Sequence, residues 1–335
     1  MKRILVIATG GTIASAEEGS GLAPALTGEQ LVAAVPAVAQ LADVAVSQVM
    51  NIDSTNMRPE GWLDIAAEIR RAWDRFDGFA VLHGTDTLAY TAAGLSYLVQ
   101  ASLKPIVLTG SQLPMGDPGT DGVRNVADAM RVACDDAAAG VLVAFGGKVI
   151  AGTAARKVRT RDFVAFDSLN APDLGVVGES GVRWATGAAA RMQPAMGADG
   201  SPRFFDALNP RVMALKVTPG MDGRAIDALR PLCDALVVEA FGLGGIPEYA
   251  GVTDALLAWV DAGKTLVMTT QCPYEGVDLG VYEVGRAFCD RPGVLMGGTA
   301  TIEALLAKTM WALAQAERPD GAVDREKLAE LFASC

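Results

Sequence analysis

The sequence predicts an α/β protein with a larger, mainly parallel N-terminal domain and a smaller C-terminal α/β domain. Short apolar runs alternate with amphipathic stretches along the first half, which is the βαβ rhythm of a parallel sheet. A shorter series of the same kind begins near Val212. The 335 residues also exceed what one hydrophobic core usually organises. We therefore predict domains over 1–185 and 211–335, joined by a linker over 186–210.

The first series supplies the expected elements of the larger domain. Its apolar runs predict strands over 4–9, 44–49, 79–82 and 106–109. Amphipathic stretches predict helices from Thr27, over 59–76, over 88–99 and after Asp121. Thr27 and Gln30 have the spacing of a capping box, and Pro59 stands at a first helical position.

The second series predicts the smaller domain. Strands are expected over 212–217, 236–240 and 265–269, and helices over 223–229 and 254–261. The segment before this series is rich in Ala, Gly, Pro and Met and has no sustained period, which favours a linker.

Charge and composition exclude several classes of protein. A net charge of -11 repels phosphate backbones and anionic lipids, so we expect neither a nucleic-acid partner nor a membrane. The five cysteines are widely spaced and form no CxxC pair, so we expect neither a metal nor a disulfide framework, and no cofactor. The apolar run after Arg3 is too short for a signal peptide. Reduced thiols without an export signal predict a cytoplasmic protein.

Candidate chemistry lies in the loops that follow the strands. In an open parallel sheet, ligands bind beyond the carboxyl ends of the strands. Four such loops carry hydroxyl, amide or acidic side chains: TGGT at 9–12, NIDSTN at 51–56, HGTDT at 83–87 and GSQ at 110–112. Glycines at 10 and 11 allow a sharp turn, after which Thr12 presents a hydroxyl.

Each loop also has a simpler interpretation. Thr12 could cap an ordinary strand-to-helix turn, and a dinucleotide fingerprint is weaker because its third glycine is missing. Thr85 beside Asp86 can supply a reactive hydroxyl and an acid, although a solvated turn could look the same. His83, the only histidine, fits a structural hydrogen-bonding role better than that of an acid or base. Lys157 is an alternative base, or part of a solvated basic run.

The loops read together resemble the bacterial-type L-asparaginases over nearly the whole chain. ATGGTIA at 8–14 and HGTDTL at 83–88 resemble the two threonine motifs of that family. IDSTNM at 52–57 resembles its substrate-binding loop, and TGSQLP at 109–114 the loop after the fourth strand. The stretch from 155 to 168 is similar to the region of the catalytic lysine, and TQC at 270–272 with GVDL at 276–279 resembles the cytoplasmic type I members.

The resemblance implies hydrolysis of L-asparagine to L-aspartate and ammonia through an acyl-threonine intermediate. Thr12 would be the nucleophile, and Thr85, Lys157 and Asp86 would form a linked hydroxyl, base and acid. Asp53, Ser54 and Thr55, with Thr85 and Asp86, would bind the α-carboxylate and α-ammonium groups of the substrate. The backbone N–H groups of Gly11 and Thr85 would stabilise the oxyanion. The resemblance also implies a homo-oligomer, either a dimer or a tetramer.

Two departures from the family pattern concern the site. Leu22 stands where a loop tyrosine is expected to hydrogen-bond the nucleophile. The segment FGLGGIP at 241–247 has glycine where exported members carry an asparagine. Arg156 and other neighbours of the motif differ from type I members that bind a regulatory asparagine near Cys272, which weighs against such a site here.

Other functions remain open on sequence grounds. The chain could prefer glutamine, use it beside asparagine, or use a D-amino acid amide. An amidotransferase subunit acting with tRNA is disfavoured, because such subunits carry an extra N-terminal domain and a basic surface. A binding module without turnover, with the glycine turns as an anion cradle, belongs to a different class.

Overall fold

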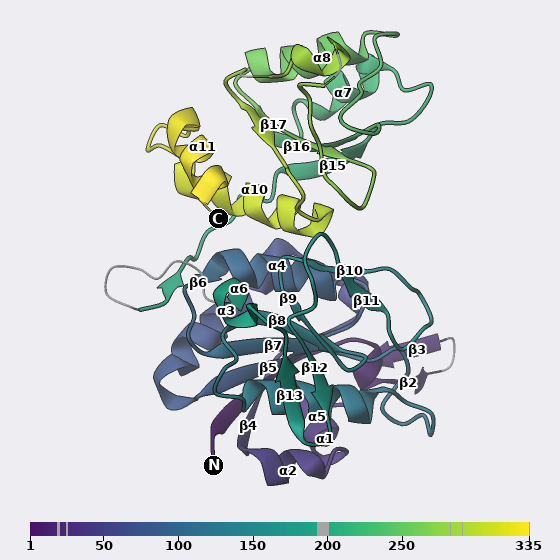
Figure 1. Ribbon diagram of the computed structural model, residues 1–335, viewed down its shortest axis with the longest axis vertical. Coiled ribbons are helices and arrows are strands. Elements are labelled where there is room, and N and C mark those ends of the chain that lie inside the picture. Colours follow the sequence, from purple (N-terminus) through teal and green to yellow (C-terminus); the bar gives the residue numbers. More distant parts are fainter. Residues whose placement is uncertain (19–20, 25, 193–200, 282, 290, 335) are drawn as a thin grey trace. The chain divides into compact units, whose positions relative to one another are not determined.

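The computed structural model describes residues 1–18, 21–24, 26–192, 201–281, 283–289 and 291–334 (Figure 1). The chain divides into two compact units, Met1–Asp206 and Ala207–Cys335. Each has a parallel sheet with helices, so the predicted fold class is confirmed. The expected linker contains a short helix and a short strand, α6 (Ala188–Met192) and β14 (Arg203–Phe204), while 193–200 lie outside the described residues.

The first unit is built on an eight-stranded sheet in the order β13-β12-β9-β8-β7-β5-β1-β4. Its parallel part comprises β4 (Asp43–Ile52), β1 (Arg3–Gly10), β5 (Gly78–Leu82), β7 (Pro105–Thr109) and β8 (Gly140–Phe145). An antiparallel extension comprises β9 (Lys148–Ala151), β12 (Gly175–Gly178) and β13 (Gly181–Trp184). Every residue of β5 and β7 is buried, as expected for central strands covered on both faces.

The helices of this unit cover both faces of the sheet. They are α1 (Gly28–Ala33), α2 (Ala37–Leu41), α3 (Pro59–Ala72), α4 (Leu88–Leu98) and α5 (Gly122–Ala133). The predicted helix over 59–76 is divided, because the chain tightens into a 3-10 turn at Trp73–Arg75. The predicted capping box is present, with the Thr27 side chain accepting from the Gln30 N–H and the Gln30 side chain from the Thr27 N–H.

Three short pairings complete the first unit. They are β2 (Ser15–Glu18) with β3 (Gly21–Pro24), β6 (Val99–Gln100) with β14, and β10 (Ala155–Lys157) with β11 (Phe166–Ser168). Two further 3-10 turns, Thr12–Ala14 and Ser54–Asn56, follow β1 and β4 directly.

One crossover in the sheet has an unusual hand. Residues of α1, α2 and α5 share one buried cluster with alternate residues of the strands, whereas α3 packs on α4 over the other face (Figure 1). The steps from β5 to β7 and from β7 to β8 run in the same direction, yet α4 and α5 lie on opposite faces. The connections from β1 to β4, from β4 to β5 and from β5 to β7 share one hand, and the connection from β7 through α5 to β8 has the opposite hand. Since about 98% of such crossovers are right-handed, the connection through α5 is left-handed.

The second unit has a four-stranded parallel sheet in the order β15-β16-β17-β18. The strands are β15 (Val212–Lys216), β16 (Ala235–Ala240), β17 (Thr265–Thr270) and β18 (Val294–Met296). Its helices are α7 (Gly223–Leu229), α8 (Val252–Asp261), α9 (Glu283–Arg286), α10 (Ile302–Ala316) and α11 (Arg325–Ser334). A buried cluster that includes Val238, Trp259 and Met268 forms its core. Of the helices in the described part of the chain, none has the length and apolar character needed to span a membrane.

Candidate active site

The loops that follow β1, β4, β5 and β7 lie so close together that their backbones are in contact. This was expected, because parallel strands end at the same edge of a sheet. A Cβ built on Gly11 would lie 2.3 Å from the Cα of Gly84, and one built on Gly84 would lie 2.6 Å from the Oγ of Ser54. A Cβ on Gly110 would lie 2.1 Å from the carbonyl oxygen of His83. Only glycine allows so close an approach of backbones. These contacts bring the four loops together at one edge of the sheet.

Thr12 begins the 3-10 turn that follows β1. Gly10 and Gly11 have φ angles of 97° and 84°, a region that glycine adopts readily. The pairing of β1 with β4 shifts register between Ala8 and Gly10, and the N–H of Gly11 donates to the carbonyl of Ile52 over 2.8 Å. This N–H already has a backbone acceptor in the structure, and the expectation that it stabilises an oxyanion stays a prediction.

Thr85, Asp86 and Lys157 form a connected group, although Lys157 is 71 residues from Asp86 along the chain. The Nζ of Lys157 lies 2.7 Å from the Oγ1 of Thr85 and 2.6 Å from the Oδ1 of Asp86. The antiparallel pairing of Lys157 with Phe166 on β11 holds the lysine in place. The lysine side chain is 17% exposed and the Asp86 side chain 59% exposed, so one end of the ion pair is in solvent.

Gln112 is a further member of this group. The hydroxyl of Thr85 donates to the Oε1 of Gln112 over 3.2 Å, and the Nε2 of Gln112 donates to the carbonyl of Asp162 over 3.2 Å. The Oγ1 of Thr85 thus lies between the Nζ of Lys157 and the Oε1 of Gln112. The carboxylate of Asp121 accepts the N–H of Gln112 and fixes the loop after β7.

Sequence reasoning placed Gln112 in a candidate loop but gave it no role. The only indication in the sequence was the position of Gln112 just after β7, where a side-chain amide can face the other loops.

The loop after β4 presents the residues expected to bind the substrate's charged groups. The Oδ1 of Asp53 accepts from both the N–H and the hydroxyl of Thr55, over 2.8 and 2.9 Å. Ser54 is buried, and its carbonyl accepts from the hydroxyl of Thr87 over 2.8 Å. The β4 and β5 loops are thus joined by a hydrogen bond as well as by glycine packing.

His83 is wholly buried beneath the loop after β5. Its Nδ1 lies 2.7 Å from the carbonyl oxygen of Gly84, and its Nε2 lies 2.9 Å from the Oγ1 of Thr91. Burial lowers the pKa of His83 to about 4 despite the bond to the Gly84 carbonyl, so the ring is neutral near pH 7. These contacts fit the structural interpretation of this residue.

Two family models together cover most of the chain. The model described as "Asparaginase, N-terminal" matches residues 3–190, and "Glutaminase/Asparaginase C-terminal domain" matches residues 211–324. The chain belongs to the asparaginase family. The family membership predicted from the loop motifs is therefore confirmed.

Individual relatives of this asparaginase-family chain differ in their functions. It is 38% identical to the L-asparaginase of Thermococcus kodakarensis over 93% of this chain and 92% of the relative. It is 33% identical to a Glutamyl-tRNA(Gln) amidotransferase subunit of Pyrococcus furiosus, over 92% of this chain and 72% of that protein. The solved structure of the thermostable L-asparaginase from Thermococcus kodakarensis superposes with a TM-score of 0.86 at 36% identity, covering 98% of this chain and 96% of that one.

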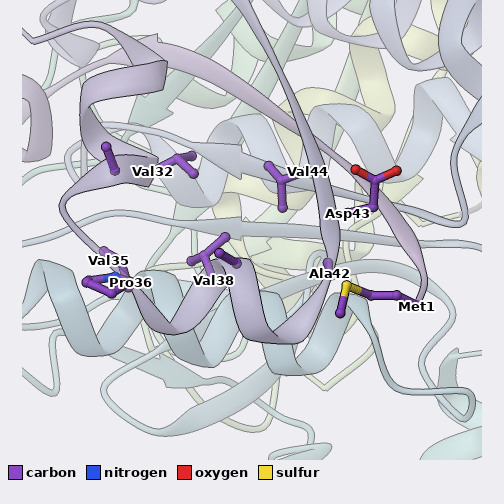
Figure 2. A pocket seen from close by; sticks show the side chains of 10 residues that line it. Met1, Val32, Val35, Pro36, Val38, Ala42, Asp43 and Val44 are labelled. Carbon is purple, nitrogen blue, oxygen red and sulfur yellow. The ribbon is translucent and has the colours of Figure 1, made fainter.

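Other features of this family member lie apart from the four loops. Figure 2 shows an apolar hollow of about 530 Å³ at the start of β4. Its walls come from residues such as Val32, Val38 and Val44, with Asp43 as the one charged side chain. Since β4 begins there and Ser54 follows its other end, this hollow is separate from the candidate site.

Two residues noted in the sequence add nothing to the site geometry. The side chain of Leu22 lies outside the described part of the structure. Cys272 is an exposed free thiol of the second unit. In the described part of the chain, His, Cys, Asp and Glu side chains form no group of three or more able to hold a metal ion.

Proposed function

We propose that the protein hydrolyses L-asparagine to L-aspartate and ammonia, with Thr12 as the nucleophile. The observation that carries the proposal is the contact of Lys157 Nζ with both Thr85 and Asp86, beside a loop in van der Waals contact with the Thr12 turn. A hydroxyl is a weak nucleophile until a neighbouring base accepts its proton. Lys157 can act as this base once its ammonium has passed a proton to Asp86, to which it is hydrogen-bonded.

The reaction then proceeds in two balanced steps. The Thr12 oxygen attacks the carbon of the side-chain amide, and its proton passes through the Thr85–Lys157 pair to the leaving nitrogen, which departs as ammonia. Water then attacks the threonine ester: its hydroxyl completes the aspartate carboxylic acid and its other proton returns to Thr12. The acid then loses its proton to ammonia, which gives the aspartate carboxylate and ammonium. The same groups serve as base and acid in turn.

Substrate binding follows from the charges on the loops. The carboxylates of Asp53 and Asp86 suit the α-ammonium group, while the hydroxyls and N–H groups of Ser54 and Thr55 suit the α-carboxylate. The N–H of Thr85 is the remaining donor for the oxyanion, since that of Gly11 is engaged. The homo-oligomer and the cytoplasmic location implied by the family resemblance are part of the same proposal.

The test is ammonia release from L-asparagine, L-glutamine and D-asparagine, with Thr12→Ala and Thr85→Ala beside the parent. We expect turnover of L-asparagine by the parent and its loss in both variants. Greater turnover of glutamine would favour the glutaminase alternative, since one methylene discriminates by only about 1 to 3 kcal/mol. Ligand binding with no ammonia from any amide would favour a binding module and refute the proposal.

The nucleophile has a separate test. Lys157→Met, mixed with L-asparagine, should slow the second step enough for an acyl adduct to be found on the peptide that contains Thr12. An adduct on the Thr85 peptide would reverse the assignment of the two threonines. Light scattering of an active sample decides the oligomeric state, with a mass of 34.7 kDa arguing against an oligomer.

A further inference from the structure

The backbone N–H of Thr85 is buried and available to a ligand. Thr85 is only 4% exposed, yet in the described part of the chain its N–H donates to no acceptor. More than about 90% of buried backbone N–H groups have a partner, so such a group needs an explanation. The preceding carbonyl provides it, because the Gly84 oxygen accepts a hydrogen bond from His83.

Peptide geometry links these two facts. No peptide bond between described residues is cis. In a trans peptide the C=O and the next N–H point to opposite sides. Because the Gly84 carbonyl is directed at the His83 ring over 2.7 Å, the Thr85 N–H is directed away from the ring. Rotation of this peptide would turn the N–H as well, so the ring controls where that group points.

The proton positions on the ring follow from its two partners. The Gly84 carbonyl can only accept, so Nδ1 carries the proton. Nε2 is then bare and accepts from the hydroxyl of Thr91 over 2.9 Å. Thr91 is fixed in the first turn of α4, where its N–H donates to the carbonyl of Thr87. The ring is therefore held by α4 at Nε2, while its Nδ1 bonds the carbonyl of Gly84 in the loop.

We propose that His83 is a positioning residue that aims the Thr85 N–H at the carbonyl oxygen of the substrate amide. The inference rests on the proposed amide hydrolysis, in which attack by Thr12 turns that oxygen into an oxyanion. Loss of one well-placed oxyanion donor lowers kcat by about 10²–10³ in other enzymes. A Thr85 N–H that points in the wrong direction still stabilises the oxyanion in part. We therefore expect kcat to fall roughly tenfold when the bond from His83 to Gly84 is lost.

Two conservative variants separate the two nitrogens. The side-chain amide of asparagine reaches about as far as Nδ1, and that of glutamine about as far as Nε2. His83→Asn should keep the bond to Gly84 and retain kcat within about threefold. His83→Gln should keep only the bond to Thr91 and lose about tenfold in kcat, with KM changed less than about threefold.

A role in stability alone would affect the two variants alike. Thermal unfolding of both, measured beside kinetics, shows whether each is folded. Equal kcat values for the two folded variants, or a lower value for His83→Asn, would overturn the proposal.

A second measurement does not depend on activity. Since the chain has one histidine, the imidazole signals in a ¹⁵N NMR spectrum of the labelled protein belong to His83. We expect a protonated Nδ1 and a bare Nε2 near pH 7. The opposite tautomer in an active parent would defeat the positioning role alone. A parent that releases no ammonia would defeat the proposed function, and the positioning role with it.

Discussion

Replacing Lys157 with methionine should separate catalysis from stability. The substitution keeps the length of the side chain but removes Nζ, which contacts Thr85 at 2.7 Å and Asp86 at 2.6 Å. A positioned acid or base contributes about 10²–10⁴ to the rate. We therefore expect kcat for ammonia release from L-asparagine to fall about 10³-fold, equivalent to about 4 kcal/mol of activation free energy.

Stability should change little in the same variant. The Asp86 carboxylate is 59% exposed and stays solvated without its partner. Ion pairs of this kind contribute about 0–1 kcal/mol to the free energy of unfolding, so the Tm should move by no more than about 2–4 °C. Calorimetry and steady-state kinetics on one preparation measure both quantities.

Lys148 provides the matched control. Its Nζ contacts Asp167 at 2.8 Å, and its side chain is 28% exposed, but it lies on β9 and hydrogen-bonds to neither of the two threonines. Lys148→Met should retain kcat within about threefold while losing a comparable ion pair. If Lys157→Met kept more than a tenth of the parent kcat, or if both variants lost activity equally, the role assigned to Lys157 would be refuted.

Three further predictions concern the surrounding loops. The pKa of His83 is about 4 in the folded protein against 6.5 for the free side chain, so the folded state binds fewer protons between these values. Its contribution, roughly 3 kcal/mol, is present above pH 6.5 and lost towards pH 4; urea unfolding should show this slope in the parent and a weaker one in His83→Asn. Gly11→Ala should lower the Tm and abolish most activity, because its Cβ would lie 2.3 Å from a backbone carbon, whereas Gly116→Ala, with open space around it, should not. Gln112→Leu removes the acceptor of the Thr85 hydroxyl and should lower kcat roughly tenfold with KM little changed; an unaltered kcat would exclude a role for this bond.

Strands β1, β5 and β7 could be predicted because their burial leaves a direct signal, although β8, which is equally buried, was missed. Strands such as β5 and β7 are covered on both faces and read as continuous apolar runs between glycine or proline signals. The antiparallel strands β12 and β13 have four residues each and include glycines, so they carry too little pattern to be recognised. The hand of the crossover through α5 has no sequence signal at all.

The meeting of the four loops was also predictable, since parallel strands end at the same edge. Lys157 was different, because it reaches Thr85 from a short antiparallel pair and not from a strand end of the parallel sheet. The residues alone left Lys157 open between an alternative base and a solvated basic run, and the family resemblance favoured the base. The hydrogen bond of the Gly11 N–H could not be predicted, because it depends on a two-residue shift in the pairing of β1 with β4.

The glycine contacts between the loops divide the site into parts that differ in how freely they can be redesigned. Gly11, Gly84 and Gly110 touch neighbouring backbone or a buried serine, so any larger residue there displaces a whole loop. Thr55, which we propose binds the α-carboxylate of the substrate, is exposed and hydrogen-bonds only within its own loop. A library aimed at another amide should hold the three glycines constant and diversify position 55, where a new side chain changes the ligand contacts and leaves the scaffold as it is.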